Sequence, residues 1–338
     1  MLRAFEGAPS DVSNALDLAI IIVSWNCSDA LADCLRSLAD GAREADDMLS
    51  YETAVVDNRS ADDTVERLRR EFPDVRIIAN DKNVGFAAAN NQGIEATTGR
   101  HVLLLNPDTI VAPGALVTLV RALEADATIG CLGPMLLNAD GSLQPSVRQL
   151  PTVAAFCHRY TPLRMLKVCK GAYARYKMRD FDYDRAADAP SLVGAAMCMP
   201  RRILQQVGLM DERFFLYFEE TDLCRRIAEA GHRVCYTPVA QITHIGNVSG
   251  IQSTPALLYR RSMLKYVAKY GGGCGGMKAF GLLVGMFVQE LMQLTFCVPV
   301  SGLMFLFGQW RPAAKKWRRA AYAARFLFRD GWQMLTGK

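Results

Sequence analysis

Short apolar runs alternate with helical stretches over the first part of the chain, and this alternation constrains the fold more than any other feature. The runs are Ala19–Ser24, Thr53–Val56, Val75–Ala79, His101–Leu105 and Ile129–Leu132, and the helical stretches between them are 29–39, 61–71, 86–96 and 113–125. Strands and helices that alternate in this way build a mostly parallel sheet with helices on both faces. We therefore predict a Rossmann-like α/β domain whose ligand loops lie at the carboxyl ends of the strands.

Less regular sequence follows residue 135. A hairpin turn is predicted at Asn138–Gly141, and the basic, aromatic stretch 150–188 is interpreted as a variable insertion or lid. Regular structure is then expected as a strand over Ser191–Met199, a helix from Arg201, a helix over Glu220–Ala230 with Gly231 as its C-cap, and a strand pair within Arg233–His244. We expect one folded domain over 18–254, preceded by a disordered segment at 1–17.

The net charge of +5 is distributed unevenly along the chain. Residues 255–338 contain thirteen Lys and Arg against two acids, Glu290 and Asp330, which gives +11, whereas the first 254 residues carry −6. Such an asymmetry favours an anionic partner for the C-terminal region, either nucleic acid or a layer of lipid head groups.

The same region contains thirty largely apolar residues, 279–308, in which Glu290 is the only charge. This stretch is long enough to span a bilayer, but the polar pair Gln289 and Glu290 and the later Pro299 favour a kinked, re-entrant or interfacial helix pair. A helix buried in a protein core is the alternative.

The segment after it predicts an amphipathic helix. At about 100° per residue, apolar side chains point in one direction at Trp310, Ala314, Trp317, Ala321, Ala324, Phe328, Trp332 and Leu335. Arg and Lys surround this stripe, which is typical of a helix that lies in an anionic bilayer surface. Because nucleic acid would make no use of the adjacent apolar run, we expect 255–338 to form membrane-associated helices and expect no nucleic-acid partner.

Cysteine usage and the N-terminus bear on the compartment. The ten cysteines include no CxxC pair, which predicts buried thiols in a reducing compartment. The first 17 residues lack the apolar core of a signal sequence, so export is not expected. Together with a membrane-associated tail, this predicts the cytoplasmic face of the cell membrane.

Asp57 follows the second predicted strand. A carboxylate there could accept a hydrogen bond from a nucleobase or a ribose hydroxyl, but Asn58 or Ser60 could instead cap the next helix and leave Asp57 solvated. No GxGxxG follows the first strand, which ends at Ser24 and continues with Trp25, Asn26 and Cys27. A dinucleotide site, and with it a nicotinamide oxidoreductase, is therefore disfavoured.

Asn106 and Asp108 follow the fourth strand on either side of a proline. Such oxygen ligands suit Mg²⁺ or Mn²⁺ bound to a diphosphate, although the same residues form ordinary turns. His244 ends the last predicted strand and could complete the coordination of that cation, or it could be purely structural.

Three acids, Glu219, Glu220 and Asp222, come directly after the apolar run Phe214–Phe218. Acids clustered beside apolar surface repel one another and lose solvation, which raises a carboxyl pKa and prepares a general base. Alternatively, these acids occupy the first turn of a helix, where its dipole favours them.

In order and spacing, these features resemble the family 2 inverting glycosyltransferases with the GT-A type fold, a group that includes bacterial rhamnosyltransferases of O-antigen and cell-wall assembly. The resemblance covers about residues 18–250. It is carried by Ile22–Asn26, Val56–Asp62, Asn83–Gly93, Asn106–Asp108, Gly194–Met197, Phe214–Asp222 and His244–Ser249.

The resemblance implies a nucleotide-sugar half at 18–135 and an acceptor half at 190–250. In the first half, it implies that Ser24, Asn26, Asp57, Asn83 and Asn106 border the nucleotide sugar, and that Asp108 binds Mg²⁺ or Mn²⁺ on the diphosphate. His244 would be a second metal ligand.

In the acceptor half, the resemblance implies that Gly194 and Glu219 face the acceptor sugar and that Glu220 deprotonates its hydroxyl. Two positions depart from the family pattern, which usually has Asp where Asn106 stands and Glu-Asp where this chain has Glu219 and Glu220. Asp222 is a rival for part of the base role.

The implied activity is transfer of a sugar from a nucleotide diphosphate donor to a lipid-linked saccharide in surface polysaccharide synthesis. dTDP-rhamnose is the first candidate donor; UDP-galactofuranose and UDP-glucose are alternatives. A catalytically inactive GT-A domain that serves as a membrane-bound scaffold is a further alternative.

Overall fold

A computed structural model describes residues 16–45, 47–246, 255–307 and 310–336. The chain divides into two compact units. The sheet unit consists of residues up to 150 together with 178–255, and the helical unit consists of 151–177 together with the chain from 256 onward.

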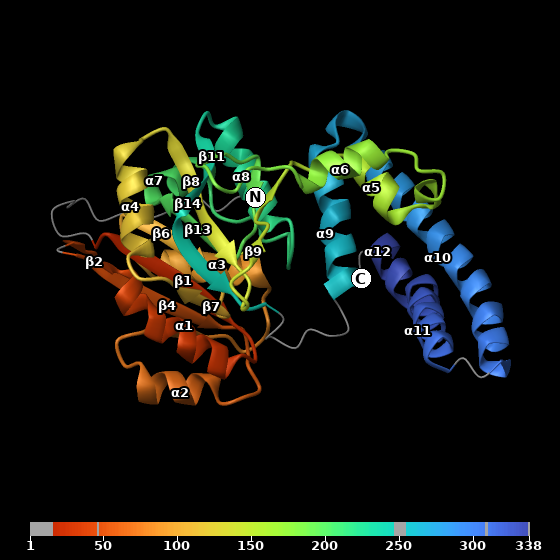
Figure 1. Ribbon diagram of the computed structural model, residues 1–338, viewed down its shortest axis with the longest axis horizontal. Helices are drawn as coiled ribbons and strands as arrows, with labels where there is room; N and C mark the ends of the chain where they lie inside the picture. The colour runs from red at the N-terminus through yellow and green to blue at the C-terminus, as the bar shows by residue number, and fades with distance from the viewer. Residues whose placement is uncertain (1–15, 46, 247–254, 308–309, 337–338) are drawn as a thin grey trace. The chain divides into compact units, whose positions relative to one another are not determined.

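The sheet unit is built around a ten-stranded sheet (Figure 1). Its main path runs β11(Ala187–Asp188), β14(Arg233–His244), β8(Ile129–Leu137), β13(Ala196–Pro200), β6(His101–Leu105), β1(Leu18–Ser24), β4(Tyr51–Asp57) and β5(Arg76–Ala79), with β7(Thr109–Val111) beside β14 and β9(Leu143–Gln144) beside β8. Strands β6, β1, β4 and β5 are parallel, whereas β13 is antiparallel to both of its neighbours. The predicted α/β fold is confirmed, with a parallel half and a second half in which parallel and antiparallel pairings are mixed.

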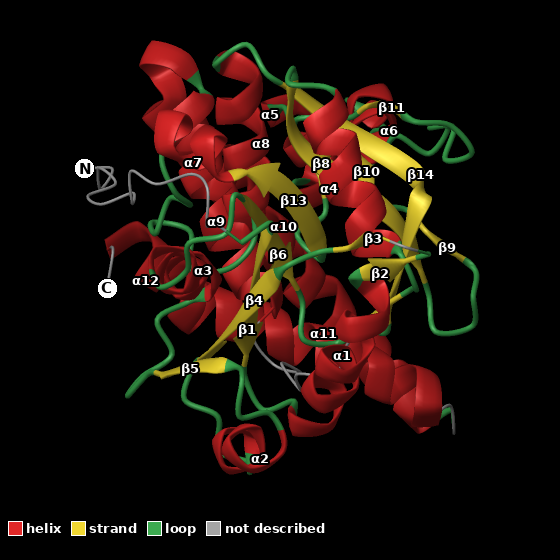
Figure 2. Ribbon diagram, turned by 90° about the vertical axis from the view of Figure 1, so that its left-hand side faces the viewer, coloured by secondary structure: helices red, strands yellow, loops and turns green. Residues whose placement is uncertain are grey.

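Helices cover both faces of this sheet (Figure 2). They are α1(Ser28–Gly41), α2(Thr64–Glu71), α3(Phe86–Glu95), α4(Ala115–Ala125), α7(Arg201–Val207) and α8(Glu219–Glu229). The side chains of β1 alternate between two cores: Ile20 and Ile22 lie in one, and Ala19 and Ile21 lie in the other. Strands buried on both faces are apolar without alternation, which is why continuous apolar runs marked them in the sequence.

Two predicted strands differ from those observed. Ser191–Met199 was expected as one strand, but β12(Ser191–Leu192) and β13 are separated by a turn at 193–195. The expected strand pair within Arg233–His244 is one twelve-residue strand with a register shift between Thr237 and Gln241. The hairpin turn at Asn138–Gly141 is confirmed and joins β8 to β9.

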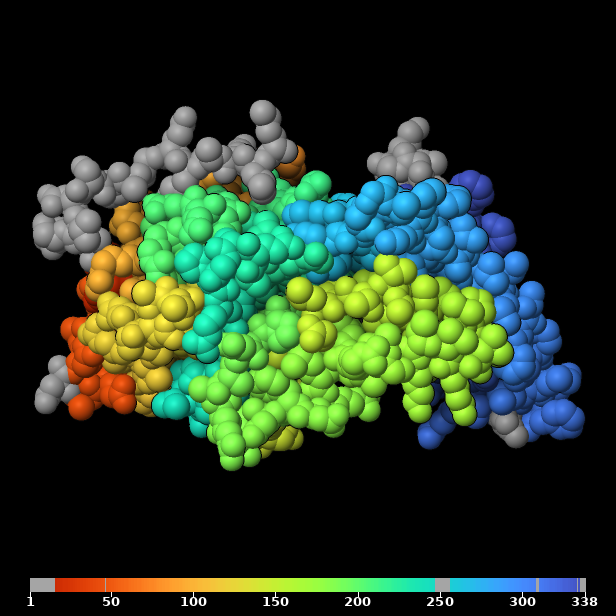
Figure 3. Space-filling model, turned by 90° about the horizontal axis from the view of Figure 1, so that it is seen from above, coloured from red at the N-terminus to blue at the C-terminus, as the bar shows by residue number. Residues whose placement is uncertain are grey.

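The helical unit contains α5(Val153–Tyr160), α6(Lys170–Lys177), α9(Pro255–Tyr270), α10(Gly275–Leu306), α11(Trp310–Arg325) and α12(Gly331–Thr336). The stretch interpreted as an insertion or lid contributes its first part, 151–177, to this unit, where α5 packs on α10 (Figure 3). Gly285 permits this close crossing, because a Cβ there would lie 2.7 Å from Cγ2 of Thr161.

Helix α10 runs without interruption through Pro299, where a kinked or paired helix was expected. Its one acid, Glu290, is buried and accepts a 2.5 Å hydrogen bond from Arg260 of α9. Among the described residues, the segment Gly272–Leu306 is the one helix long and apolar enough to cross a membrane.

Candidate active site

Ser24 and Asp57 lie opposite each other where the parallel strands β1 and β4 end. Both are buried. The Asp57 carboxylate accepts hydrogen bonds from the backbone N–H and the hydroxyl of Ser60. Asn26, at φ 52°, closes the same corner by donating its N–H to the Ser60 hydroxyl at 2.9 Å. Asp57 is thus held by its own loop and is not a solvated side chain.

Asn58 organises the next loop and was not among the predicted site residues. Its side-chain oxygen accepts from the Val84 N–H at 3.3 Å, and its amide donates to the Gly85 carbonyl at 3.2 Å. Asn83 accepts from the Gly85 N–H at 3.0 Å and lines a hollow of about 470 Å³ beside α3. The loop that carries Asn83 is therefore tied to the end of β4.

Asp108 and His244 come together although 136 positions separate them, because β7 and β14 pair. The Asp108 Oδ1 lies 3.4 Å from the His244 Nε2. The backbone N–H of Ile245 also donates to the Asp108 carbonyl at 2.9 Å. The predicted juxtaposition of these two residues is present in the structure.

Gln144 determines which nitrogen of His244 carries the proton. The Gln144 amide nitrogen donates to the Asn138 side-chain oxygen at 2.9 Å and to the His244 carbonyl at 3.2 Å. Its oxygen therefore accepts from His244 Nδ1, at 2.7 Å. In the neutral ring the lone pair is then on Nε2, which faces Asp108 and the Asn106 amide, 3.3 Å away.

These donors fit a divalent cation. Two ligands bound side by side to a cation at ~2.1 Å lie about 3 Å apart, close to the observed spacing of Asp108 and His244. The described residues contain no group of three or more His, Cys, Asp or Glu that could hold a metal. A cation at this pair would therefore depend on further oxygens, such as those of a diphosphate.

Cys27 contacts Ser24 at the end of β1. Its thiol lies 3.3 Å from the Ser24 hydroxyl. Burial, and then the nearby Asp108 carboxylate, raise the pKa of Cys27. The influence of Asp108 on Cys27 indicates that both lie at the same edge of the sheet.

The third group of site residues begins helix α8. Glu219 is buried, and Glu220 lies beside Gly194, where a Cβ would contact the Glu220 side chain at 3.4 Å. Gly194 is followed by Ala195, whose carbonyl accepts from the Asn106 N–H at 2.9 Å. The turn between β12 and β13 therefore links the metal-type residues to the acids.

The backbone is strained where it enters α8. Tyr217 and Phe218 both adopt left-handed conformations, with φ of 70° and 73°. Gly85, at φ 92°, receives this loop: a Cβ there would lie 2.7 Å from both the ring and the carbonyl oxygen of Phe215. Non-glycine residues in this region of φ cost about 1–3 kcal/mol each, and such strain clusters at functional sites.

Two of the three acids have perturbed pKa values. Burial, and then the neighbouring Glu220, raise the pKa of Glu219 well above its ordinary value. Burial also raises the pKa of Glu220 to about 7, although backbone N–H groups at the start of α8 oppose the shift. One carboxylate oxygen of each is buried without a hydrogen-bond partner among the described residues. Glu220 is therefore poised to exchange a proton near neutral pH.

Asp222 is arranged differently. Its carboxylate is fully buried and bonded to the Arg226 guanidinium at 2.8 Å. Arg226 also donates to the carbonyls of 207–209, which connects α8 to the end of α7. This pairing leaves the geometry of a general base to Glu220.

The structure thus brings the predicted residues to one edge of the sheet. Asn247, Val248 and Ser249, part of the motif after His244, lie outside the described residues. Sequence reasoning missed Gln144 and Asn58. Asn58 could have been predicted from the sequence, because it directly follows Asp57 at the end of a strand. Gln144 is recognisable as a site residue only from the hairpin that brings it to His244.

Comparisons with known proteins agree with this arrangement. The sequence model described as "Glycosyltransferase like family 2" matches residues 15–263, which is more than half of the chain. The chain belongs to this glycosyltransferase family. The match contains the whole of the described edge of the sheet.

Related sequences of the transferase include a bacterial and an archaeal glycosyltransferase. It is 28% identical over 240 residues to the N-acetylglucosaminyl-diphospho-decaprenol L-rhamnosyltransferase of Mycobacterium tuberculosis, covering 67% of this chain and 75% of that protein. It is 23% identical over 232 residues to a low-salt glycan biosynthesis hexosyltransferase of Haloferax volcanii, covering 68% of this chain and 67% of that one.

Solved structures of glycosyltransferases share the fold of the transferase. GalNAc-T7 with UDP, GalNAc and Mn²⁺ aligns at a TM-score of 0.52 and 18% identity, covering 76% of this chain and 51% of that chain. The Pyrobaculum calidifontis mannosyltransferase PcManGT, in complex with GDP-Man and Mn²⁺, aligns at 0.50 and 16% identity, covering 97% and 91%. The predicted GT-A fold is confirmed.

Proposed function

We propose that this glycosyltransferase is a metal-dependent, inverting enzyme that transfers a sugar from a nucleotide diphosphate to a lipid-linked saccharide. Rhamnose from dTDP-rhamnose is the first candidate donor, with UDP-sugars as alternatives. The name of the mycobacterial relative, a rhamnosyltransferase acting on a diphospho-decaprenol, supports both the sugar and the acceptor class.

The single observation that supports this mechanism best is the environment of the Glu220 carboxyl group. Its pKa of about 7 and its unpartnered, buried oxygen suit a general base at neutral pH. Gly194 lies beside it, because a Cβ there would be in van der Waals contact with the Glu220 side chain at 3.4 Å. We assign Glu220 to accept the proton of the acceptor hydroxyl, with Gly194 and Glu219 bordering the acceptor.

In this reaction the acceptor oxygen attacks the anomeric carbon as its proton moves to Glu220. The bond from that carbon to the diphosphate oxygen breaks, and the electron pair leaves with the nucleoside diphosphate. Attack opposite the leaving group inverts the anomeric centre. Asp222 acts through Arg226 as a positioning residue for α8.

The donor lies against the other polar groups at the edge of the sheet. Ser24, Asn26, Asp57 and Asn83 border the nucleotide, and Asn106 borders the diphosphate. Asp108 and His244 would hold the cation, Mg²⁺ or Mn²⁺, and such a cation would neutralise charge on the leaving diphosphate. Mn²⁺ accompanies the nucleotide or nucleotide sugar in both of the structural neighbours described above, which supports a divalent cation.

The helical unit attaches the enzyme to the cytoplasmic face of the membrane, where a lipid-linked acceptor is available. Its long apolar helix supports this placement. A soluble acceptor would need no such helix.

The deciding experiment is a thermal-shift panel of detergent-purified protein with dTDP-rhamnose and several UDP- and GDP-sugars, each with and without Mn²⁺. A ligand at about 100 times its Kd adds about 2.7 kcal/mol of stability, so the donor should produce a clear shift that requires metal. Asp108→Ala should abolish that metal dependence. If folded protein shows no shift with any nucleotide sugar, the inactive scaffold replaces this proposal.

A further inference from the structure

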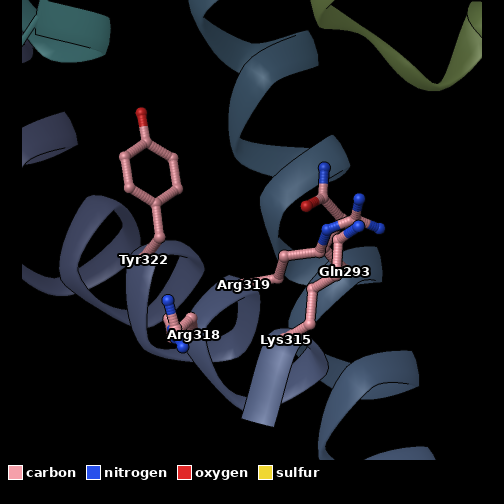
Figure 4. Close-up of a pocket in the computed structure, with 5 residues that line it drawn as sticks. All are labelled: Gln293, Lys315, Arg318, Arg319 and Tyr322. Carbon is pink, nitrogen blue, oxygen red and sulfur yellow. The ribbon is translucent and has the colours of Figure 1, made fainter. Parts of the chain in front are cut away.

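A basic pocket lies between α10 and α11 within the helical unit. Its volume is about 460 Å³, and it is lined by Gln293 of α10 and by Lys315, Arg318, Arg319 and Tyr322 of α11 (Figure 4). Each of these side chains can donate a hydrogen bond, and no acid lines the pocket. Figure 4 shows Lys315 and Arg319 reaching toward Gln293 on the neighbouring helix.

The three cations come from one face of α11, and Figure 4 shows Lys315 and Arg319 close together with Arg318 set apart from them. Positions 315, 318, 319 and 322 lie on one face of a helix. No ion pair joins Lys315, Arg318 or Arg319 to an acid of the described residues, whereas Arg325 of the same helix meets Asp330 at 3.1 Å. Neighbouring like charges repel, so an anion bound among them would be favoured.

The donors suit phosphate in particular. Guanidinium groups bind phosphate oxygens through paired hydrogen bonds, and an ammonium group adds a compact charge. The volume lies within the usual range of small-ligand sites, about 300–1,000 Å³. The Tyr322 ring lines the pocket, and its hydroxyl points away from Lys315 and Arg319 (Figure 4).

The surroundings favour a phosphate carried by a lipid. Along α11 and just beyond it, Trp310, Trp317, Phe328 and Trp332 form an aromatic stripe, and each is 57–77% exposed. This stripe borders the basic face, as it does in helices that lie at the level of membrane head groups. Exposed apolar residues of α10, such as Phe280 and Phe296, continue the apolar surface. RNA would have no use for such a surface.

We infer that this pocket binds the phosphate group of a membrane lipid, which fixes the helical unit in the head-group layer. The inference rests on the membrane attachment in the proposed function and adds a defined site to it. The phosphate could belong to an anionic phospholipid or to the diphosphate of a polyprenyl-linked lipid. Both present the same chemistry to the three cations.

The test is vesicle flotation of the full chain with a matched pair of charge variants. Arg318→Gln/Arg319→Gln removes two pocket cations, and Arg311→Gln/Arg329→Gln removes two exposed cations of the same region outside the pocket. Vesicles of phosphatidylcholine alone are compared with vesicles containing phosphatidylglycerol, and with vesicles containing a polyprenyl diphosphate. Circular dichroism checks that each variant is folded.

The pocket variant should lose at least about tenfold more affinity than its control on one of the two vesicles that contain an anionic lipid, and that vesicle identifies the lipid. Equal losses by the two variants would mean diffuse attraction and would overturn the site. Binding of the wild type to RNA in preference to every vesicle would also overturn it.

Metal-dependent donor hydrolysis in detergent separates this inference from the proposed function. The pocket variant should hydrolyse donor like the wild type, and Asp108→Ala should float with the same vesicles as the wild type. Loss of hydrolysis alone therefore counts against the transferase mechanism, and loss of vesicle selectivity alone counts against the pocket.

Discussion

The sheet unit and the helical unit treat charge in opposite ways. In the sheet unit, Arg201 is buried and donates to the carbonyls of Ile94 and Gly99, and Arg121 is bonded to Asp47 and Glu124. In the helical unit, the cations of the basic pocket meet no acid of the described chain, and large aromatic side chains remain exposed. The sheet unit pairs these arginines internally, whereas the pocket cations of the helical unit are left for a ligand from outside the chain.

The largest expected effect separates the catalytic role of the sheet unit from membrane binding. Glu220→Gln should lower kcat by about 10²–10⁴-fold, because the acceptor hydroxyl loses its base. Vesicle binding should be unchanged. Transfer assays and flotation measure the two properties, and Glu229→Gln, an exposed change on the same helix, serves as control. A comparable loss of activity in the control would remove the assignment of Glu220.

The next test compares a buried ion pair of the helical unit with an exposed one of the sheet unit. Glu290→Ala leaves Arg260 buried without its anion and should destabilise the protein by about 3–5 kcal/mol. Asp188→Ala breaks the exposed pair with Arg233 and should cost at most about 1 kcal/mol. Thermal unfolding in detergent measures both. Equal costs would mean that Glu290 is not held as the structure indicates.

The variant Gln144→Leu tests whether Gln144 positions His244 in the sheet unit. Without the amide that accepts from His244 Nδ1, the ring loses its fixed orientation, and the affinity for Mn²⁺ in the presence of a nucleoside diphosphate should fall about 10–100-fold. Titration calorimetry measures this directly, and Gln149→Leu, an exposed change nearby, is the control. Unchanged affinity would show that His244 is positioned without Gln144.

The pH dependence gives the smallest effect. Because the pKa of Glu220 is raised to about 7, kcat/KM should rise about tenfold per pH unit below that value and level off above it. Stability should move the other way: the contribution of a raised carboxyl pKa is present below the ordinary value of 4.5 and is lost as pH rises through about 7. In Glu220→Gln, both of these dependences should weaken.

The sequence was sufficient to predict the parallel half of the sheet. Its strands are buried on both faces, so continuous apolar runs such as Ala19–Ser24 marked them, and the side chains that follow these strands had to meet at one edge. Asp57 and Asp108 were found in this way. The turn at 193–195 was not predicted, because apolar residues continue through it.

Packing between segments far apart in the sequence was not predicted, for a different reason. The hairpin turn at Asn138–Gly141 was predicted, but only the pairing of β8 with β14 brings Gln144 to His244. Likewise, nothing local in 151–177 indicates that α5 packs on a helix that begins at residue 275. Local periodicity reports which face of an element is buried and not what buries it.

The division of the helical unit also has a consequence for synthesis on the ribosome. Residues 151–177 are made roughly a hundred positions before α10, their partner, which corresponds to about 5–20 s of elongation. During that interval the sheet unit acquires its last strand, β14, while α5 has no helix to pack against. The newborn chain therefore exposes Ala155 and Phe156 of α5, which are buried in the finished protein, until its C-terminal helices arrive.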